Sequence, residues 1–322
     1  MVRWAPTSRS PCAQAKSQVI PKAVVLWRTC DLLCARYFER RPPHNAPPPF
    51  CLLTRMENLR ALVRQMVKTY ILPYSAELKA GWYGLGIIAF SILASQKIKA
   101  SYGRHFTPSS FVPAVNGKAG WMIMEMVSPA TMVLMFNTFK SLGPVLSTGR
   151  VLYFLWLAHY FNRSFYSVLR SPSVKQSRLD IVLYSAAFNA ISAGWIGYDL
   201  ADLNTQAFEL SFKSLVGLTL FVLGVATNIR VDYQLQDARQ KAGGQYILPD
   251  WGLYKYIVSP NYAAEIVEWT GFALLQGRES AWAFVFWTVC NLAPRARSHL
   301  LWYKEKFGVK VGDRTSIIPY VL

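Results

Sequence analysis

The sequence predicts an all-α, polytopic membrane protein built as a bundle of seven transmembrane helices. Hydrophobic residues make up 52% of the 322 residues and charged residues only 16%, well below the roughly 25% usual in soluble domains. The net charge of +18 would suggest nucleic acid in a soluble protein. Here the basic residues gather between apolar runs, where they fit phosphate groups and membrane lipid headgroups. We therefore expect a lipid environment and no nucleic-acid partner.

Residues 1–55 differ in composition from the rest of the chain. They are basic, contain the Pro-rich stretch that follows Arg40 and Arg41, and hold four of the five cysteines. No cysteine spacing resembles a zinc site. We expect a disordered basic extension, added by a start codon assigned too early, because Met56 opens a more regular sequence. Residues 56–322 are then the membrane domain.

Seven apolar runs follow Met56, and several reach the ~20 residues of a membrane span only if the helix extends past the strictly apolar part. In chain order the runs are Trp82 to Gln96, Ala119 to Phe139, Val151 to Leu169, Ile181 to Leu200, Phe208 to Thr227, Tyr262 to Leu275 and Ala281 to Cys290. Lys and Arg collect in alternate loops, such as the loops that hold Lys97 and Arg170, and in the tail after Tyr303. The positive-inside rule places these loops and the carboxyl terminus in the cytosol.

Glu125 and Tyr160 are among the polar residues within the second and third apolar runs. Glu125 lies in an apolar surrounding that favours its protonated form, which donates a hydrogen bond. Tyr160 is a phenol in the middle of its run and is a natural second donor. Such a pair polarises a carbonyl oxygen on which negative charge develops. The alternative, equally compatible with the spacing, is that Glu125 pairs with His159 or Arg163 to hold two helices together.

The last quarter of the chain carries polar residues at helical spacing. Asn261, Glu265 and Glu268 share one helix face, and Arg295 and His299 share another. Because such faces are costly to bury in lipid, we expect them to face each other or a cavity. The alternative is a pair of salt-bridged packing faces. The sequence contains no G-x-G-x-x-G after a strand, no Walker lysine, and no metalloprotease or serine-hydrolase motif, so we expect no metal and no Rossmann or P-loop cradle.

From about Met56 onward the chain resembles the steroid 5α-reductase family of membrane enzymes. The motifs that carry the resemblance are Tyr102-Gly-Arg-His105, Trp121-x3-Glu125, His159-Tyr-Phe-Asn-Arg163, Asn228-Ile-Arg-Val-Asp232-Tyr233, Asn261-Tyr-x2-Glu265-x2-Glu268-Trp269, and Arg295-Ala-x2-His299-x3-Tyr303. The carboxyl-terminal motifs alone would indicate the wider superfamily, which includes enoyl-CoA and polyprenol reductases. The first two motifs narrow the resemblance to the steroid branch.

The resemblance implies an enzyme of the endoplasmic reticulum membrane that reduces a 3-oxo-Δ4-steroid or sterol enone with NADPH. It implies that Glu125 and Tyr160 bind the 3-keto oxygen. The residues that it assigns to the cofactor are Tyr102, Trp121, Asn228, Asp232, Arg239, Tyr246, Asn261, Glu265, Arg295, His299 and Tyr303. Two alternatives remain open: a very-long-chain trans-2-enoyl-CoA reductase, and a non-catalytic membrane protein that binds sterol in the same cavity.

Overall fold

The computed structural model describes residues 49–97, 105–171 and 176–318. The chain divides into two units, residues 1–73 and residues 74–322. In the first unit helix α2 (Pro49–Met66) runs on into a π-helical turn at Val67–Ile71. The predicted extension lies mostly outside the described residues, so its disorder and its boundary at Met56 stay predictions.

The second unit is helical, and all seven predicted apolar runs lie on its helices. These helices are α3 (Ser75–Ala94), α4 (Gly117–Phe139), α5 (Thr148–Phe161), α6 (Ser167–Arg170), α7 (Leu179–Asp202), α8 (Phe212–Lys241), α9 (Pro260–Gln276) and α10 (Glu279–Phe307). The third run covers α5, the π-helical turn Asn162–Tyr166 and α6. The fifth run was predicted from Phe208, but its helix begins at Phe212, because the side chain of Ser211 accepts a hydrogen bond from the backbone of Ser214 and caps the helix there.

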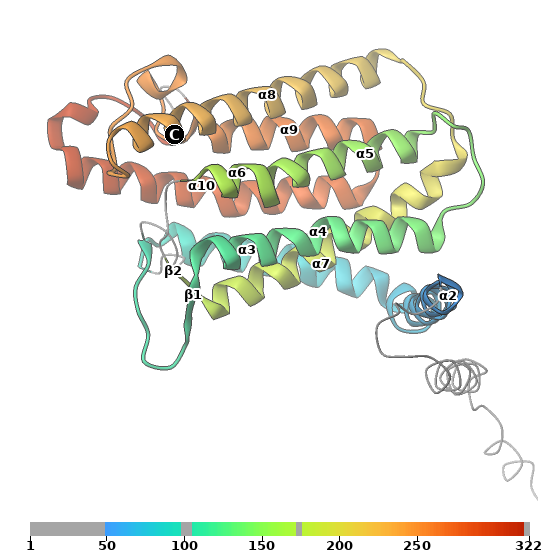
Figure 1. The fold of residues 1–322 in the computed structure, drawn as a ribbon. Coiled ribbons are helices and arrows are strands. Elements are labelled where there is room, and N and C mark those ends of the chain that lie inside the picture. The colour runs from blue at the N-terminus through green and yellow to red at the C-terminus, as the bar shows by residue number, and fades with distance from the viewer. Residues whose placement is uncertain (1–48, 98–104, 172–175, 319–322) are drawn as a thin grey trace, which may run out of the picture. The chain divides into compact units, whose positions relative to one another are not determined.

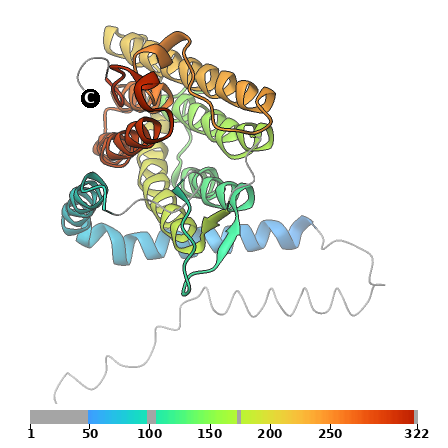
Figure 2. The ribbon, with the colours of Figure 1, turned by 90° about the vertical axis from the view of Figure 1, so that its left-hand side faces the viewer.

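Figure 1 shows α5, α8, α9 and α10 lying side by side, with α4 and α7 as a neighbouring pair. Figure 2 shows, after a turn of 90°, that α7 also passes beside α10.

A short two-stranded sheet adds to the predicted all-α fold. Strand β1 (Ala114–Asn116) pairs antiparallel with β2 (Gln176–Arg178), and Val115 lies opposite Ser177. Three-residue strands leave no alternation that a sequence pattern can reveal. Since β1 leads directly into α4 and β2 into α7, the pair holds the first residues of these two helices together.

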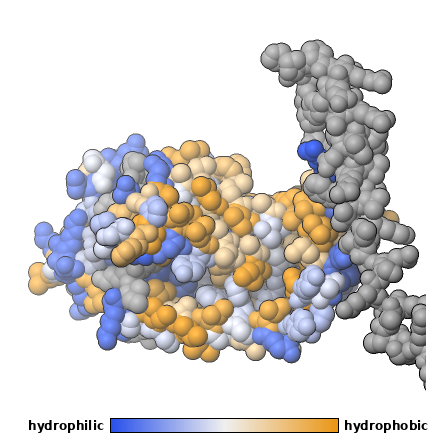
Figure 3. Space-filling view, turned by 90° about the horizontal axis from the view of Figure 1, so that it is seen from below, coloured by the Kyte–Doolittle hydropathy of each residue, from blue (hydrophilic) through white to orange (hydrophobic). Residues whose placement is uncertain are grey.

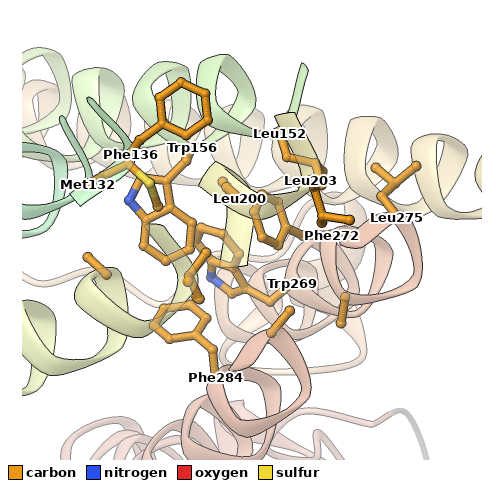
Figure 4. Packing of buried hydrophobic residues seen from close by; sticks show 14 of the residues in the cluster. Met132, Phe136, Leu152, Trp156, Leu200, Leu203, Trp269, Phe272, Leu275 and Phe284 are labelled. Carbon is orange, nitrogen blue, oxygen red and sulfur yellow. The ribbon is translucent and has the colours of Figure 1, made fainter. Parts of the chain in front are cut away.

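The apolar core lies between α4, α5, α7, α9 and α10, as Figure 4 shows. Trp156 is fully buried, and its ring centroid lies 5.0 Å from that of Trp269 and 5.2 Å from that of Phe284. Its indole N–H donates to the hydroxyl of Ser128 at 3.1 Å. Tyr160 follows one helical turn after Trp156, so this aromatic packing fixes the position of the Tyr160 backbone.

Glycines let α8 and α9 approach closely. A Cβ atom added to Gly224 would lie 2.6 Å from the Cα of Glu268, and one added to Gly217 would lie 3.0 Å from the carbonyl oxygen of Gly271. Small residues at a helix contact are the usual means of close packing within membranes. The backbone of Glu268 is thereby held against α8.

We expect Gly224→Ala to destabilise the bundle, because the new methyl group must push α8 and α9 apart. Overpacking of this kind costs about 1–3 kcal/mol, and thermal unfolding of the protein in detergent should show a lower Tm. Gly84→Ala in α3 is the matched control, since a Cβ there meets nothing within 4 Å and alanine favours helix. Equal Tm values for the two variants would contradict the close approach.

Three of the described helices are long and apolar enough to cross a membrane, namely Gly117–Phe139, Leu179–Thr205 and Phe212–Lys241. Large apolar side chains are also exposed on α4, α5, α7 and α8, among them Ile123, Phe154, Leu183 and Leu223. Figure 3 shows hydrophobic residues over the middle of one face and hydrophilic residues gathered at one end. Such exposure is typical of a membrane protein. The number of seven spans stays a prediction.

Candidate active site

A cavity of about 460 Å³ lies within the second unit. Helices α4, α5, α7, α8, α9 and α10 all contribute to its wall. The predicted site residues that line it are Trp121, Glu125, Tyr160, Asp232, Asn261, Glu265 and Arg295. The polar faces of α9 and α10 thus meet at this cavity through Asn261, Glu265 and Arg295. The aromatic side chains of Phe188, Phe284 and Trp287 line it as well, so it combines ionisable groups with an apolar surface.

Glu125 reaches the cavity from α4, one turn before Pro129. Proline has no N–H to bond to the carbonyl four residues earlier, so the helix is weakened at Glu125 itself. Tyr160 enters from α5, and its O–H donates to the Oδ1 atom of Asn189 at 3.3 Å. Asn189 in turn donates from Nδ2 to the carbonyl oxygen of Met124 at 2.7 Å. This second bond turns the Asn189 oxygen toward the phenol and thereby fixes the direction of the tyrosine hydrogen.

Arg163 links two of the carboxyl groups in the cavity. Its Nε atom lies 3.6 Å from Oε1 of Glu125, and its Nη2 atom lies 3.6 Å from Oε2 of Glu265. Its guanidinium carbon lies 4.9 Å from the ring centroid of Trp121. Arg163 belongs to the π-helical turn Asn162–Tyr166, a distortion that often marks functional sites because it redirects side chains. One cation therefore holds the proposed ketone-binding acid and a proposed cofactor residue together.

Of the two partners considered for Glu125 as a group that holds helices together, the structure shows one. Glu125 does lie at ion-pair distance from Arg163, but His159 pairs with a different carboxylate, Glu268 on α9. The imidazole Nδ1 and Oε1 of Glu268 form a short contact, and both side chains are buried. The ring of His159 also packs edge-on against Tyr160 and Trp269, with centroid distances of 5.0 and 4.6 Å. Ion pairing and access to the cavity thus coexist at Glu125.

Of the remaining residues that were predicted to bind the cofactor, those that the structure describes do not line the main cavity. Asn228 lines a second, smaller cavity between α5 and α8. The guanidinium carbon of Arg239 lies 4.4 Å from the ring centroid of Tyr246. The ring of His299 stacks on that of His105 at 5.7 Å. Tyr303 is buried in a cluster with Val258 and Val311, and Tyr102 lies outside the described residues.

Lys306 also lies close to the ring of Tyr246. Its Nζ atom is 5.1 Å from the ring centroid of Tyr246 and 5.2 Å from that of Trp302. Together with Arg239 it makes Tyr246 the centre of a basic aromatic cluster. This cluster suits an anionic part of a ligand. The main cavity, which is a separate place, suits the part of a ligand that reacts.

Two residues of the site were not predicted as site residues. Asn189 lies in the fourth apolar run. A single amide side chain in such a run is costly to bury in lipid, and this could have marked Asn189 as a site residue. Arg163 was considered only as a packing partner of Glu125, because spacing does not show which carboxylates a long side chain reaches. No group of three or more His, Cys, Asp or Glu side chains able to hold a metal is found among the described residues.

A cavity lined by ionisable side chains, between helices that expose large apolar side chains, is typical of a membrane protein with an internal binding site. The family model described as 3-oxo-5-alpha-steroid 4-dehydrogenase matches residues 174–322. Steroid 5-alpha-reductase DET2 of Gossypium hirsutum is 33% identical over 70% of this chain and 89% of its own length.

Two mammalian proteins named 3-oxo-5-alpha-steroid 4-dehydrogenase 2 are also similar. The protein of Rattus norvegicus is 32% identical over 69% of this chain and 88% of its own length, and that of Homo sapiens is 31% identical over 73% and 93%. The chain belongs to the steroid 5α-reductase family, whose named members are oxidoreductases.

Proposed function

We propose that this protein reduces the C4–C5 double bond of a 3-oxo-Δ4-steroid to the 5α product. The observation that carries the proposal is that Glu125 and Tyr160 line one cavity from neighbouring helices, beside aromatic walls. A flat, apolar steroid matches the aromatic surface, and its ketone matches the two donors. Family membership supports the same reaction.

Glu125 and Tyr160 would bind the 3-keto oxygen. As the double bond is reduced, negative charge develops on that oxygen, and preoriented donors stabilise the charge. The bond from Tyr160 to Asn189 is long at 3.3 Å, so the phenol can give it up for a ketone oxygen. Arg163 lies beside Glu125 and would hold that carboxyl group in place.

NADPH, when bound, would supply the hydride to the β-carbon of the enone. The residues of the main cavity fit such a group. Asn261, Glu265 and Arg295 offer amide, carboxylate and guanidinium groups along one wall, and the buried Oε2 of Glu265 accepts no hydrogen bond from the residues that the structure describes. That oxygen is suited to a ribose hydroxyl or an amide. Arg239, Lys306 and the ring of Tyr246 offer a basic aromatic surface that suits a phosphate and a purine.

We expect Arg295→Ala to raise the apparent KM for NADPH well before it changes the affinity for steroid. Arg295 lines the cavity, where its Nη1 donates to Oδ1 of Asn291 at 3.2 Å, and a lost charged hydrogen bond costs about 1.5–3 kcal/mol, or roughly ten- to a hundredfold in KM. The matched control is Arg297→Ala, two residues along on the exposed face. Weaker steroid binding with an unchanged NADPH response would refute the role of Arg295 in cofactor binding.

The experiment that tests the function is NADPH oxidation by membranes that contain the full chain. Testosterone or progesterone is compared with a trans-2-enoyl-CoA, and the product is identified by its mass and by its configuration at C5. The 5α-reduced steroid is the expected product. Turnover of the enoyl-CoA alone would assign the substrate to the other branch of the superfamily, and NADPH binding without turnover of either would favour the non-catalytic alternative.

We further propose residence in the endoplasmic reticulum membrane, with the carboxyl terminus in the cytosol. Membership of the steroid 5α-reductase family supports the compartment. The distribution of basic residues, which fill alternate loops and the tail that holds Lys304 and Lys306, supports the orientation. The basic aromatic cluster around Tyr246 would then face the cytosol, where NADPH is available.

A further inference from the structure

A second cavity of about 180 Å³ lies between α5 and α8. One side of it is apolar, with Leu155, Val225 and Ile229 among its residues. The other side is polar and consists of His159, Asn162, Arg163, Ser167, Asn228, Asp232 and Glu268. Of these, His159, Arg163, Ser167 and Asp232 also line the main cavity. The two cavities therefore share a polar wall.

Glu268 is the buried carboxyl group of that wall, with 0% of the residue exposed. Its Oε1 atom pairs with Nδ1 of His159, but its Oε2 atom has no hydrogen-bond partner among the described residues. Leaving a buried carboxylate oxygen unbonded is costly. Glu268 borders the second cavity, which is large enough for several water molecules and offers each of them polar partners. Water in this cavity would supply the missing bond.

We propose that the second cavity holds ordered water and that Glu268 and His159 relay protons from this water to the main cavity. The inference rests on the proposed function, because reduction of an enone consumes one proton for each hydride. The electron pair of the enolate carbon–carbon bond takes the proton, so a C–H bond forms at the α-carbon, the ketone C=O bond re-forms, and the Nε2–H bond of His159 breaks. In the same step Nδ1 of His159 takes a proton from Glu268, Glu268 takes one from cavity water, and solvent returns a proton to that water.

The structure places His159 suitably for this task. Its ring is held from two sides by Tyr160 and Trp269, so it cannot turn away from Glu268 without repacking the core. It borders both cavities. The close approach of α8 at Gly224 fixes the backbone of Glu268 in the same way. Each member of the relay is thus held by packing that does not depend on substrate.

The test uses the full chain in membranes and the variant Glu268→Gln. We expect kcat for steroid reduction to fall by about 10²-fold, the usual contribution of positioned proton transfer, while the KM for steroid and the Kd for NADPH stay nearly unchanged. The solvent deuterium isotope effect on kcat should rise, because proton delivery becomes rate-limiting. The control is Ser164→Ala, which removes a buried hydroxyl of the π-helical turn Asn162–Tyr166. Ser164 does not line either cavity, so the kcat and the isotope effect of this variant should match those of the parent protein.

Val225→Phe gives an independent check, because it fills the second cavity and leaves Glu268 and His159 in place. It should reproduce the lower kcat and the larger isotope effect. Parental kcat and isotope effect in either variant would overturn the relay, and so would a loss of NADPH binding as large as the loss of kcat, which would mean a purely structural role. Absence of steroid reduction by the parent protein would instead overturn the proposed function.

Discussion

Replacing Glu125 with Gln is expected to abolish most steroid turnover while NADPH binding persists. The amide keeps the size of the side chain but lacks the acidic proton that the carboxyl group would donate to the ketone oxygen. The amide N–H can still donate a hydrogen bond, but it is far less acidic than a carboxylic O–H. Loss of a donor to a developing oxyanion costs about 10²–10³-fold in kcat, and we expect the weaker donor to cost a loss that approaches this order. Steady-state kinetics with saturating steroid, together with NADPH titration by fluorescence, measure the two quantities separately.

The control for this substitution is Glu279→Gln, which removes a carboxylate from a surface pair with Lys79 outside the cavity. It should leave kcat unchanged. Tyr160→Phe should resemble Glu125→Gln, and the double variant should lose less than the product of the two single losses, because both donors serve one oxygen. Near-normal turnover of Glu125→Gln would show that the carboxyl group only pairs helices.

Replacing Arg163 with Met is expected to have the largest effect on stability. Arg163 lies between Glu125 and Glu265, all three mostly buried, and its loss leaves two carboxyl groups without their cation. Removing one partner from a buried ion pair costs about 3–5 kcal/mol, which exceeds what most mutations cost. The yield of folded protein and the Tm in detergent should both fall sharply.

Arg170→Met is the matched control, because Arg170 forms an exposed pair with Asp237 at 2.5 Å and solvent-exposed pairs contribute little to stability. A second test adds Glu265→Gln to Arg163→Met. Glu265→Gln replaces one of the two carboxyl groups that Arg163→Met leaves without a cation, so the double variant should recover part of the lost stability. If Arg163→Met is as stable as Arg170→Met, the three-residue cluster does not stabilise the bundle.

The helices of this protein could be predicted from its sequence because each run of apolar residues is continuous. All seven predicted runs lie on helices, with an error of a few residues where Ser211 caps α8. Helix periodicity is local information, so no tertiary contact is needed to find it. The strands β1 and β2 are a different case, since their pairing joins residues about sixty positions apart and depends on how α4 and α7 pack.

The candidate site was predicted in part. Spacing on single helices put Asn261 and Glu265 on one face, and the structure places both on the cavity wall with Arg295. Spacing did not predict that Asn228 faces a second cavity or that Tyr303 is buried in an apolar cluster. Motif residues that are close in sequence were expected to act together, but a helix turns successive residues toward different neighbours.

The sequence by itself determined a helical membrane protein, its family, and the two residues proposed to bind a ketone, because these follow from composition, local periodicity and motif. Only the tertiary structure decided the partners of the charged residues: Arg163 joins Glu125 to Glu265, and His159 joins Glu268. It also decided that one oxygen of Glu268, beside a second cavity, has no hydrogen-bond partner within the part of the chain that the structure describes. The physical reason is that ion pairs and cavities form between helices, whereas a sequence pattern describes one helix at a time.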